Sequence, residues 1–345
     1  MTAIAARAPG KVVLTGEYAV LCGAPAIVAA IDRYADVRLD IDTDAGLLSV
    51  ESLVERERWT IAAPDTEELT GGDLGAVLAA LRAAAAWIPA LAGRRADVVV
   101  DARPFLVEGR KLGVGRSAAV VTAGVAAWLA AGGRRDRALT CEAAVAAHAL
   151  FQEGHGSGAD VAAAVHGGVI EFRRSAGRLA VAPRALPPGL ELLVGWTGEP
   201  ARTDPLVKHF SSAAAAREPA ALRALIEAAE EAARALAAGD AAAFCAAVTA
   251  SAEQLARLGY ELGMPIVTAA LTRLVDAAAA AGAVAKPSGA GGGDCGVAFC
   301  TSAAQADAVR AAWCALGIVP LPLAIAPAGV VVDDATAHSG EAALG

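Results

Sequence analysis

Five glycines stand within the eight residues from Gly289 to Gly296 of this 345-residue chain, between a predicted helix and a predicted strand. A flexible connector needs fewer glycines and rarely leads at once into an apolar strand such as CGVAF. Backbone that carries no side chains can approach a ligand or another loop closely. We call the segment KPSGAGGGDCG, Lys286–Gly296, the C-terminal glycine loop and predict that it lies at a binding site or loop contact.

A second glycine-rich segment, KLGVGRSAA at Lys111–Ala119, precedes a helix predicted over 117–131. We call it the central glycine loop. Free N–H groups and a partial positive charge at a helix start favour phosphate binding, although a plain strand–turn–helix connection explains the glycines equally well. The segment also matches G-x-G-x-x-A, but no second strand with an acidic residue follows, which disfavours a dinucleotide fold. A Walker A pattern is absent, which disfavours a P-loop enzyme.

Two further segments contain candidate polar groups. GHGSGAD, Gly154–Asp160, contains Ser157 and Asp160, which form either a hydroxyl–carboxylate pair or a Ser turn with a helix N-cap. APGKVVLTGEYAVL, at residues 8–21, places Lys11 among strand residues. A lysine at that position is explained if its ammonium group points into a cleft.

Charge and composition restrict the partners. The formal net charge is −8, which disfavours nucleic acid, while a local basic pocket for an anionic small molecule remains open. No apolar run reaches the ~20 residues of a membrane helix, and the six cysteines form no C-x-x-C pair. We therefore expect a cytoplasmic protein without a zinc site or disulfide framework; the oligomeric state is not indicated. Only four of the 29 basic residues are lysines, namely Lys11, Lys111, Lys208 and Lys286.

Strand and helix patterns predict two domains, 1–186 and 187–345, divided at the proline-rich stretch ALPPGLE. In the first domain, VRLDIDT and LLSVES are predicted as two strands joined across an Asp-Ala-Gly turn at 44–46. In the second, helices are predicted over about 215–237, 241–257 and 302–316.

The four segments, taken in their order along the chain, resemble motifs of the GHMP kinase superfamily. They span about 290 residues. The resemblance implies an α+β protein with an N-terminal ATP-binding domain, a C-terminal ferredoxin-like domain and an active site between them. It implies ATP and Mg²⁺ as cofactors and an anionic small molecule as substrate. Lys11 and Asp160 match the catalytic residues of the family.

The resemblance also implies the remaining site residues. Those expected to bind ATP are Lys111, Gly113, Val114, Gly115, Arg116, Ser117, Ala118 and Ala119. Those expected to bind substrate are Glu17, Tyr18, Ser157, Arg202, Thr203, Lys208, Ser288, Gly289, Ala290 and Gly291. Ser117, Glu108 and Glu153 are the expected metal ligands. Two residues depart from the family pattern, because Arg116 and Arg202 stand where serines are expected.

Within the superfamily, KPSGAGGGDCG and VGWTGEPARTDPLV most resemble the phosphomevalonate kinase branch. That branch implies transfer of a phosphoryl group from ATP to the phosphate of (R)-5-phosphomevalonate, giving 5-diphosphomevalonate in isoprenoid synthesis. Mevalonate kinase, diphosphomevalonate decarboxylase and a non-catalytic ATP-binding protein are the alternatives. A phosphate acceptor is already largely ionised near neutral pH, so cations should matter more than a base. We expect Lys11 to lie between the acceptor phosphate and the γ-phosphate of ATP, with Asp160 orienting it. Lys286 is expected to hold the C-terminal glycine loop in shape.

Overall fold

The computed structural model describes residues 2–62, 71–175, 177–201, 203–216 and 219–334; for residues 203, 204 and 214–216 it describes the backbone alone. Among the described residues, no helix is both long and apolar enough to span a membrane.

The larger sheet is built on two long strands, β1 (Thr2–Thr15) and β2 (Ala26–Ala45), which pair antiparallel along most of their length. Its order is β14-β1-β2-β5-β3-β4, with β8 beside the first part of β2 and β9 beside β8. The other strands of this sheet are β3 (Leu47–Ser52), β4 (Glu57–Ala62), β5 (Arg94–Asp101), β8 (Val169–Ser175), β9 (Arg178–Arg184) and β14 (Val331–Asp334). A small hairpin, β6 (Leu106–Val107) with β7 (Arg110–Lys111), leads into the central glycine loop.

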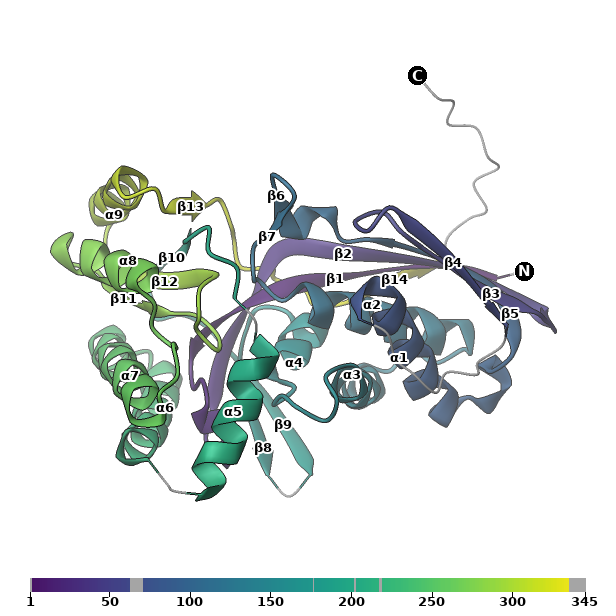
Figure 1. Cartoon of the computed structure of the whole chain (residues 1–345), viewed down its shortest axis with the longest axis horizontal. Coiled ribbons are helices and arrows are strands. Elements are labelled where there is room, and N and C mark those ends of the chain that lie inside the picture. Colours follow the sequence, from purple (N-terminus) through teal and green to yellow (C-terminus); the bar gives the residue numbers. More distant parts are fainter. Residues whose placement is uncertain (1, 63–70, 176, 202, 217–218, 335–345) are drawn as a thin grey trace.

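Four helices cover one face of this sheet (Figure 1). They are α1 (Gly72–Trp87), α2 (Arg116–Ala131), α3 (Arg137–Phe151) and α4 (Ala159–His166). The helices α2 and α4 pack on β1 and β2, and α1 and α3 pack against α2. Alanines fill these contacts, and their small side chains let the helices approach closely; the side chains of α2 are buried from Ala118 to Ala130. Short 3-10 turns lie at η1 (Ala19–Cys22), η2 (Pro89–Leu91) and η3 (Arg103–Phe105).

The smaller sheet is antiparallel and has the order β11-β12-β10-β13. Its strands are β10 (Glu191–Trp196), β11 (Val284–Pro287), β12 (Cys295–Cys300) and β13 (Val319–Leu321). The helices of this half are α5 (Thr203–Ala216), α6 (Ala220–Ala238), α7 (Ala241–Leu262), α8 (Ala269–Ala280) and α9 (Ala303–Ala315). The sequence β10–helices–β11–β12–α9–β13, with this strand order, is the ferredoxin-like arrangement that was expected.

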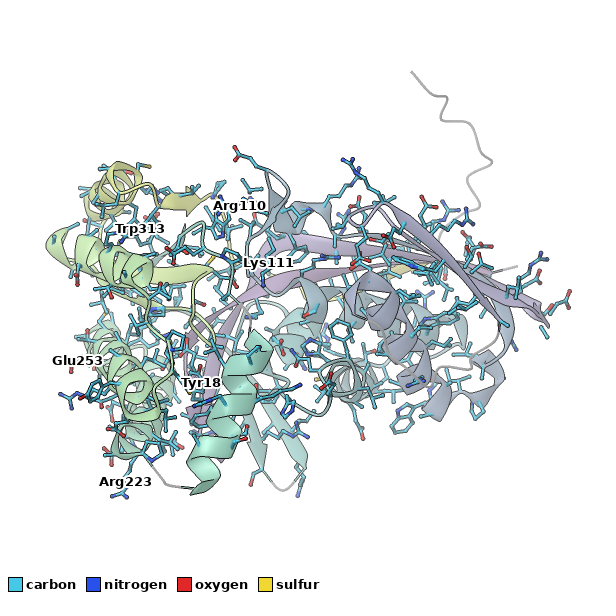
Figure 2. The ribbon with its side chains drawn as sticks, viewed as in Figure 1. Tyr18, Arg110, Lys111, Arg223, Glu253 and Trp313 are labelled. Atoms are coloured by element: carbon cyan, nitrogen blue, oxygen red, sulfur yellow. The ribbon has the colours of Figure 1, made fainter. Side chains whose placement is uncertain are left out.

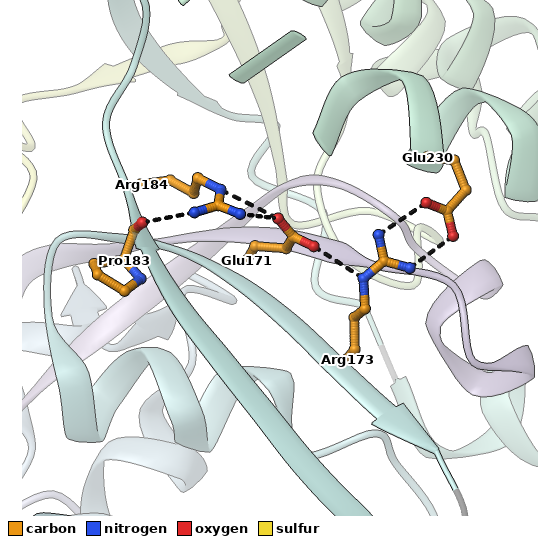
Figure 3. A network of polar contacts seen from close by, with 5 residues as sticks. All are labelled: Glu171, Arg173, Pro183, Arg184 and Glu230. Atoms are coloured by element: carbon orange, nitrogen blue, oxygen red, sulfur yellow. Dashed lines mark hydrogen bonds and ion pairs between the residues drawn. The ribbon is translucent and has the colours of Figure 1, made fainter. Parts of the chain in front are cut away.

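Several contacts tie the two halves together. After β13 the chain returns to the larger sheet, where β14 pairs with β1. On the opposite side, Arg173 of β8 donates two hydrogen bonds to Glu230 of α6, at 2.7 and 2.8 Å, and also contacts Glu171, which Arg184 holds in turn (Figure 3). The division at residues 186 and 187 stays a prediction.

One local expectation is wrong. Strands β2 and β3 form on either side of the predicted turn, but they do not pair, because β5 lies between them. Strand β3 pairs parallel with β5 instead, and Gly46 N–H donates to Gly93 O at 3.1 Å. The turn residues therefore change direction without closing a hairpin.

Candidate active site

Two cavities adjoin where the two halves of the molecule meet, and Lys11 and Asp160 line both. The first cavity is mostly apolar and is bounded among others by Tyr18, Ser157 and Ala290. The second cavity lies along the central glycine loop and is bounded among others by Lys111, Ser117 and Asp294. A group held in one cavity can therefore reach a group held in the other at Lys11 and Asp160.

Lys11 is positioned by the contact between β1 and the central glycine loop. Its backbone N–H donates to Val114 O at 2.8 Å, just after an irregularity in the pairing of β1 between Pro9 and Gly10. A Cβ on Gly115 would lie 2.9 Å from the Lys11 side chain, and Gly115 has φ +87°. Glycine at this position thus lets the lysine cross the loop.

Helix α2 begins with donors that no side chain caps. Gly115 is its N-cap residue, so the N–H groups of the first turn have no side-chain acceptor. The side chains of Val114, Ala118 and Ala119 are buried in the core, which leaves only their backbone for a ligand. These N–H groups and the positive end of the helix suit an anion in the second cavity.

Arg116 also lines the second cavity, but two carboxylates hold it. Its guanidinium bonds to the buried Asp73 of α1 and lies 3.3 Å from Glu55 Oε1. Ser52 Oγ donates to the other oxygen of Asp73 at 2.6 Å. The arginine that replaces the expected serine therefore has much of its charge compensated within the protein. Asp73 was not predicted from the sequence, because its role depends on contacts with distant segments.

His148 lies between Ser117 and Asp160. The imidazole is 2% exposed, on α3. Its Nε2 lies 3.2 Å from Ser117 Oγ at the start of α2, and its Nδ1 lies 3.7 Å from Asp160 Oδ2 at the start of α4. An isolated histidine in an alanine-rich helix gives no local signal, since these partners are distant in the sequence.

The two glutamates expected to bind metal are not among the residues that line the second cavity with Ser117. Glu108 is exposed in the turn between β6 and β7. Glu153 pairs with Lys208 at 2.7 Å, and this hydrogen bond lowers the pKa of the Glu153 carboxyl. The carboxylates that share the second cavity with Ser117 are Asp73, Asp160 and Asp294. Among the described side chains, no cluster of three His, Cys, Asp or Glu residues could hold a metal alone.

Lys111 and Asp294 both bond to the backbone of Ala201. Lys111 Nζ donates to Ala201 O, and Ala201 N donates to Asp294 Oδ1 at 3.0 Å. A Cβ on Gly113 would lie 2.2 Å from the Asp294 side chain, so the two glycine loops touch here. Burial raises the pKa of Asp294. Figure 2 shows Arg110 and Lys111 on the β6–β7 side that faces the smaller sheet, where Arg110 stacks over Trp196 at 4.9 Å.

The C-terminal glycine loop is bonded to β1 and to the turn after it. Ser288 Oγ accepts from Val13 N at 2.9 Å and donates to Val13 O at 3.0 Å. Lys286 is fully buried and forms an ion pair with Glu17. Gly289 N donates to the same carboxylate at 3.3 Å, while Glu17 Oε2 has no partner among the described residues.

The remaining expected substrate residues divide into three groups. Tyr18, Ser157, Gly289 and Ala290 line the first cavity, where Tyr18 OH donates to Ala290 O at 2.6 Å and burial raises the pKa of the tyrosine. Gly291 packs against the backbone of Ile266 instead. Arg202 lies outside the described residues, and for Thr203 only the backbone at the start of α5 is described.

Comparisons with known proteins show which family the sequence and fold of this chain are similar to. The model of the family described as "GHMP kinases C terminal" matches residues 232–319. Phosphomevalonate kinase of Streptomyces sp. strain CL190 is 35% identical over 95% of this chain and 98% of its own length. Mevalonate kinase of Aeropyrum pernix is 33% identical over 84% of this chain and 86% of its own length.

The fold is similar to a solved structure of Streptococcus pneumoniae phosphomevalonate kinase in complex with phosphomevalonate and AMPPNP. The TM-score is 0.76 at 23% sequence identity, and the match covers 93% of this chain and 99% of the other.

Proposed function

The chain belongs to the GHMP kinase family, and we propose that it transfers the γ-phosphoryl group of ATP to the phosphate of (R)-5-phosphomevalonate. The products are 5-diphosphomevalonate and ADP. The observation that carries the proposal is the shared wall of the two cavities, where Lys11 and Asp160 can reach both reactants. The Streptomyces phosphomevalonate kinase, which matches almost the whole chain, supports the choice of acceptor.

The second cavity is assigned to the triphosphate of ATP. Uncapped N–H groups at the start of α2 suit phosphate oxygens, and Lys111 supplies a cation beside them. The first cavity is assigned to the acceptor. Its mostly apolar wall suits the carbon chain of a small acid, while Lys11 lies at the end where the acceptor phosphate would meet ATP.

The oxygen donors of the second cavity fit Mg²⁺. This ion binds one or two protein oxygens together with substrate phosphates, rather than a cage of protein ligands. Ser117 Oγ and the Asp160 carboxylate are the groups proposed to hold it. When bound, Mg²⁺ neutralises charge on the β- and γ-phosphates.

In the proposed reaction an oxygen of the acceptor phosphate attacks the γ-phosphorus, and the bond to the β–γ bridging oxygen breaks. Two anions must approach, so neutralisation of charge dominates the barrier. Lys11 is assigned to the space between them, because it lines both cavities. Asp160 has no proton to remove when the acceptor is already ionised.

An alcohol acceptor is the second candidate, because the Aeropyrum mevalonate kinase also matches most of the chain. Here Asp160, which lies next to His148, would accept the hydroxyl proton. The cytoplasm is the proposed site of either reaction. None of the six cysteines, which all lie in the described part of the chain, forms a disulfide, as is usual for proteins in a reducing compartment.

A coupled assay for ADP release with mevalonate, phosphomevalonate and diphosphomevalonate tests the proposal. We expect turnover with phosphomevalonate and the appearance of a diphosphate by ³¹P NMR. Turnover with mevalonate alone would identify an alcohol kinase, and release of CO₂ from diphosphomevalonate would identify a decarboxylase. ATP binding without ADP formation on any of the three would indicate a non-catalytic protein.

A further inference from the structure

We infer that His148 is a positioning residue that fixes the hydroxyl of Ser117 and the carboxylate of Asp160 relative to each other. The inference rests on the proposed use of ATP with Mg²⁺, but not on the identity of the acceptor. It assigns His148 a task in the site rather than in the core alone.

The imidazole of His148 is buried, and both groups that it contacts belong to other helices. His148 is 2% exposed, and a buried imidazole is costly unless both ring nitrogens have partners. Neither partner belongs to α3. Ser117 is the second residue of α2 and Asp160 is the second residue of α4, so His148 connects the starts of two other helices.

The two contacts of the imidazole favour one tautomer of the ring. The carboxylate of Asp160 lies 3.7 Å from Nδ1, which is an electrostatic contact and not a direct hydrogen bond; its negative charge favours the tautomer with the hydrogen on Nδ1. In the neutral ring Nε2 is then an acceptor, and the Ser117 hydroxyl donates to it across 3.2 Å. This tautomer is assigned from the partners, because hydrogen positions follow from the hydrogen-bond network.

The contact with His148 also sets the direction of the Ser117 hydroxyl in the second cavity. When its hydrogen points towards His148, Ser117 Oγ keeps its lone pairs for the second cavity, which Ser117 and Asp160 both line. A hydroxyl that ligates a cation must present oxygen and not hydrogen. Partners behind a metal ligand commonly act in this way, and their loss typically costs 10–100-fold in metal affinity or activity.

Two isosteric variants separate the two contacts. Asparagine places an amide near the position of Nδ1, so His148→Asn keeps a donor for Asp160 and loses the acceptor for Ser117. Glutamine places an amide near Nε2, so His148→Gln keeps the acceptor for Ser117 and loses the donor for Asp160. The readout is the dissociation constant of ADP, measured by calorimetry with Mg²⁺ and with EDTA, which needs no acceptor and no turnover.

We expect His148→Asn to reduce the strengthening of ADP binding by Mg²⁺ by about 10-fold or more, with a change of less than about threefold in EDTA. His148→Gln should keep most of that strengthening. Thr140→Val is the matched control, because Thr140 is also buried on α3 and bonds only to its own helix. Thr140→Val should lower the melting temperature and leave the effect of Mg²⁺ unchanged.

A double-variant cycle covers the case in which substitution of His148 harms folding. Ser117→Ala should lose the Mg²⁺ effect, and adding His148→Asn to it should cause no further loss. Equal effects of the Asn and Gln variants, or losses that add in the double variant, would overturn the inference while wild-type turnover stays intact. A wild-type chain whose ADP binding ignores Mg²⁺ would overturn both the inference and the proposed use of the metal.

Discussion

Lys11 and Lys286 both lie in glycine-flanked segments at the meeting of the two halves, but their surroundings differ. Lys286 is fully buried, pairs with Glu17 and also donates to Pro287 O at 2.6 Å. Burial lowers the pKa of Lys286, and the Glu17 carboxylate opposes that shift. Lys11 instead lines two cavities, which it shares with Asp160, and its charge acts on the carboxylate of Asp294 across the second cavity.

The difference shows that glycine density does not identify a ligand site by itself. The C-terminal glycine loop satisfies its polar groups within the protein, through Ser288 with Val13 and Lys286 with Glu17. The central glycine loop leaves N–H donors at the start of α2 open to a cavity. The C-terminal glycine loop is therefore expected to contribute mainly to stability, and the central glycine loop mainly to catalysis.

Substitution of the buried lysine should have the largest effect on stability. Lys286→Met leaves Glu17 charged and without its partner inside the protein, which should lower the free energy of unfolding by about 3–5 kcal/mol. Urea unfolding measures the loss. The double variant Glu17→Gln/Lys286→Met removes the uncompensated charge and should recover most of the stability. A single variant as stable as wild type would show that the ion pair contributes nothing.

Substitution of the accessible lysine should instead reduce turnover. Lys11→Ala should lower kcat about 10²–10³-fold, the usual cost of removing one group that stabilises transition-state charge. The KM for ATP should change modestly, and the free energy of unfolding by less than about 1 kcal/mol. Arg7→Ala, on the exposed part of the same strand, is the control and should keep full turnover. Near-normal kcat in Lys11→Ala would contradict the assignment.

Asp160→Asn should have a smaller effect, because an ionised phosphate acceptor needs no base and the amide oxygen of asparagine can still ligate Mg²⁺. We expect kcat to fall by about tenfold or less, whereas removing a general base typically costs 10²–10⁴-fold. The initial rate with phosphomevalonate measures this, and circular dichroism checks the fold. A loss beyond about 10³-fold in a folded variant whose ADP binding still responds to Mg²⁺ would make Asp160 a base and favour an alcohol acceptor.

Much of the fold could be predicted because local signals agree with it. Gly239 and Asp240 mark the end of α6 and the start of α7, where Asp240 accepts from Ala243 N at 3.0 Å. Helix α5 was not predicted, although proline near a helix start, here Pro205, is a usual signal. The order of β2, β5 and β3 could not be predicted, because strand pairing depends on residues about 50 positions apart.

At the site, the sequence predicted several of the residues that line the cavities. It did not predict which side chains bond to one another. Lys11, Ser117 and Asp160 were predicted and do line one cavity. Their roles stay predictions. Asp73 and His148 were missed, since each acts through partners on other helices. Ser288 was expected to bind substrate, but both bonds of its hydroxyl go to Val13.

Asp294 belongs to the C-terminal glycine loop and contacts Gly113 of the central glycine loop. Of the predicted effects, the one of its titration on the stability of the protein should be the smallest. Burial raises the pKa of Asp294, so the folded chain keeps a proton there after the unfolded chain has lost it. Its contribution to stability is full below the unfolded pKa of about 3.9 and is lost as pH rises through the folded pKa. Asp294→Asn keeps an acceptor for Ala201 N–H but cannot titrate. The variant should therefore lose less stability than wild type as pH rises above about 4.

Urea unfolding at several pH values between about 4 and 7 measures this slope. Asp101→Asn is the control with the opposite sign, because hydrogen bonding to Arg103 lowers the pKa of Asp101. The contribution of Asp101 is present above its unfolded pKa and is lost as pH falls through its folded pKa. Equal slopes for Asp294→Asn and wild type would mean that the carboxyl ionises as freely in the folded chain as in water. The contact between the two glycine loops would then hold a charge that solvent or Lys111 and Lys11 already compensate.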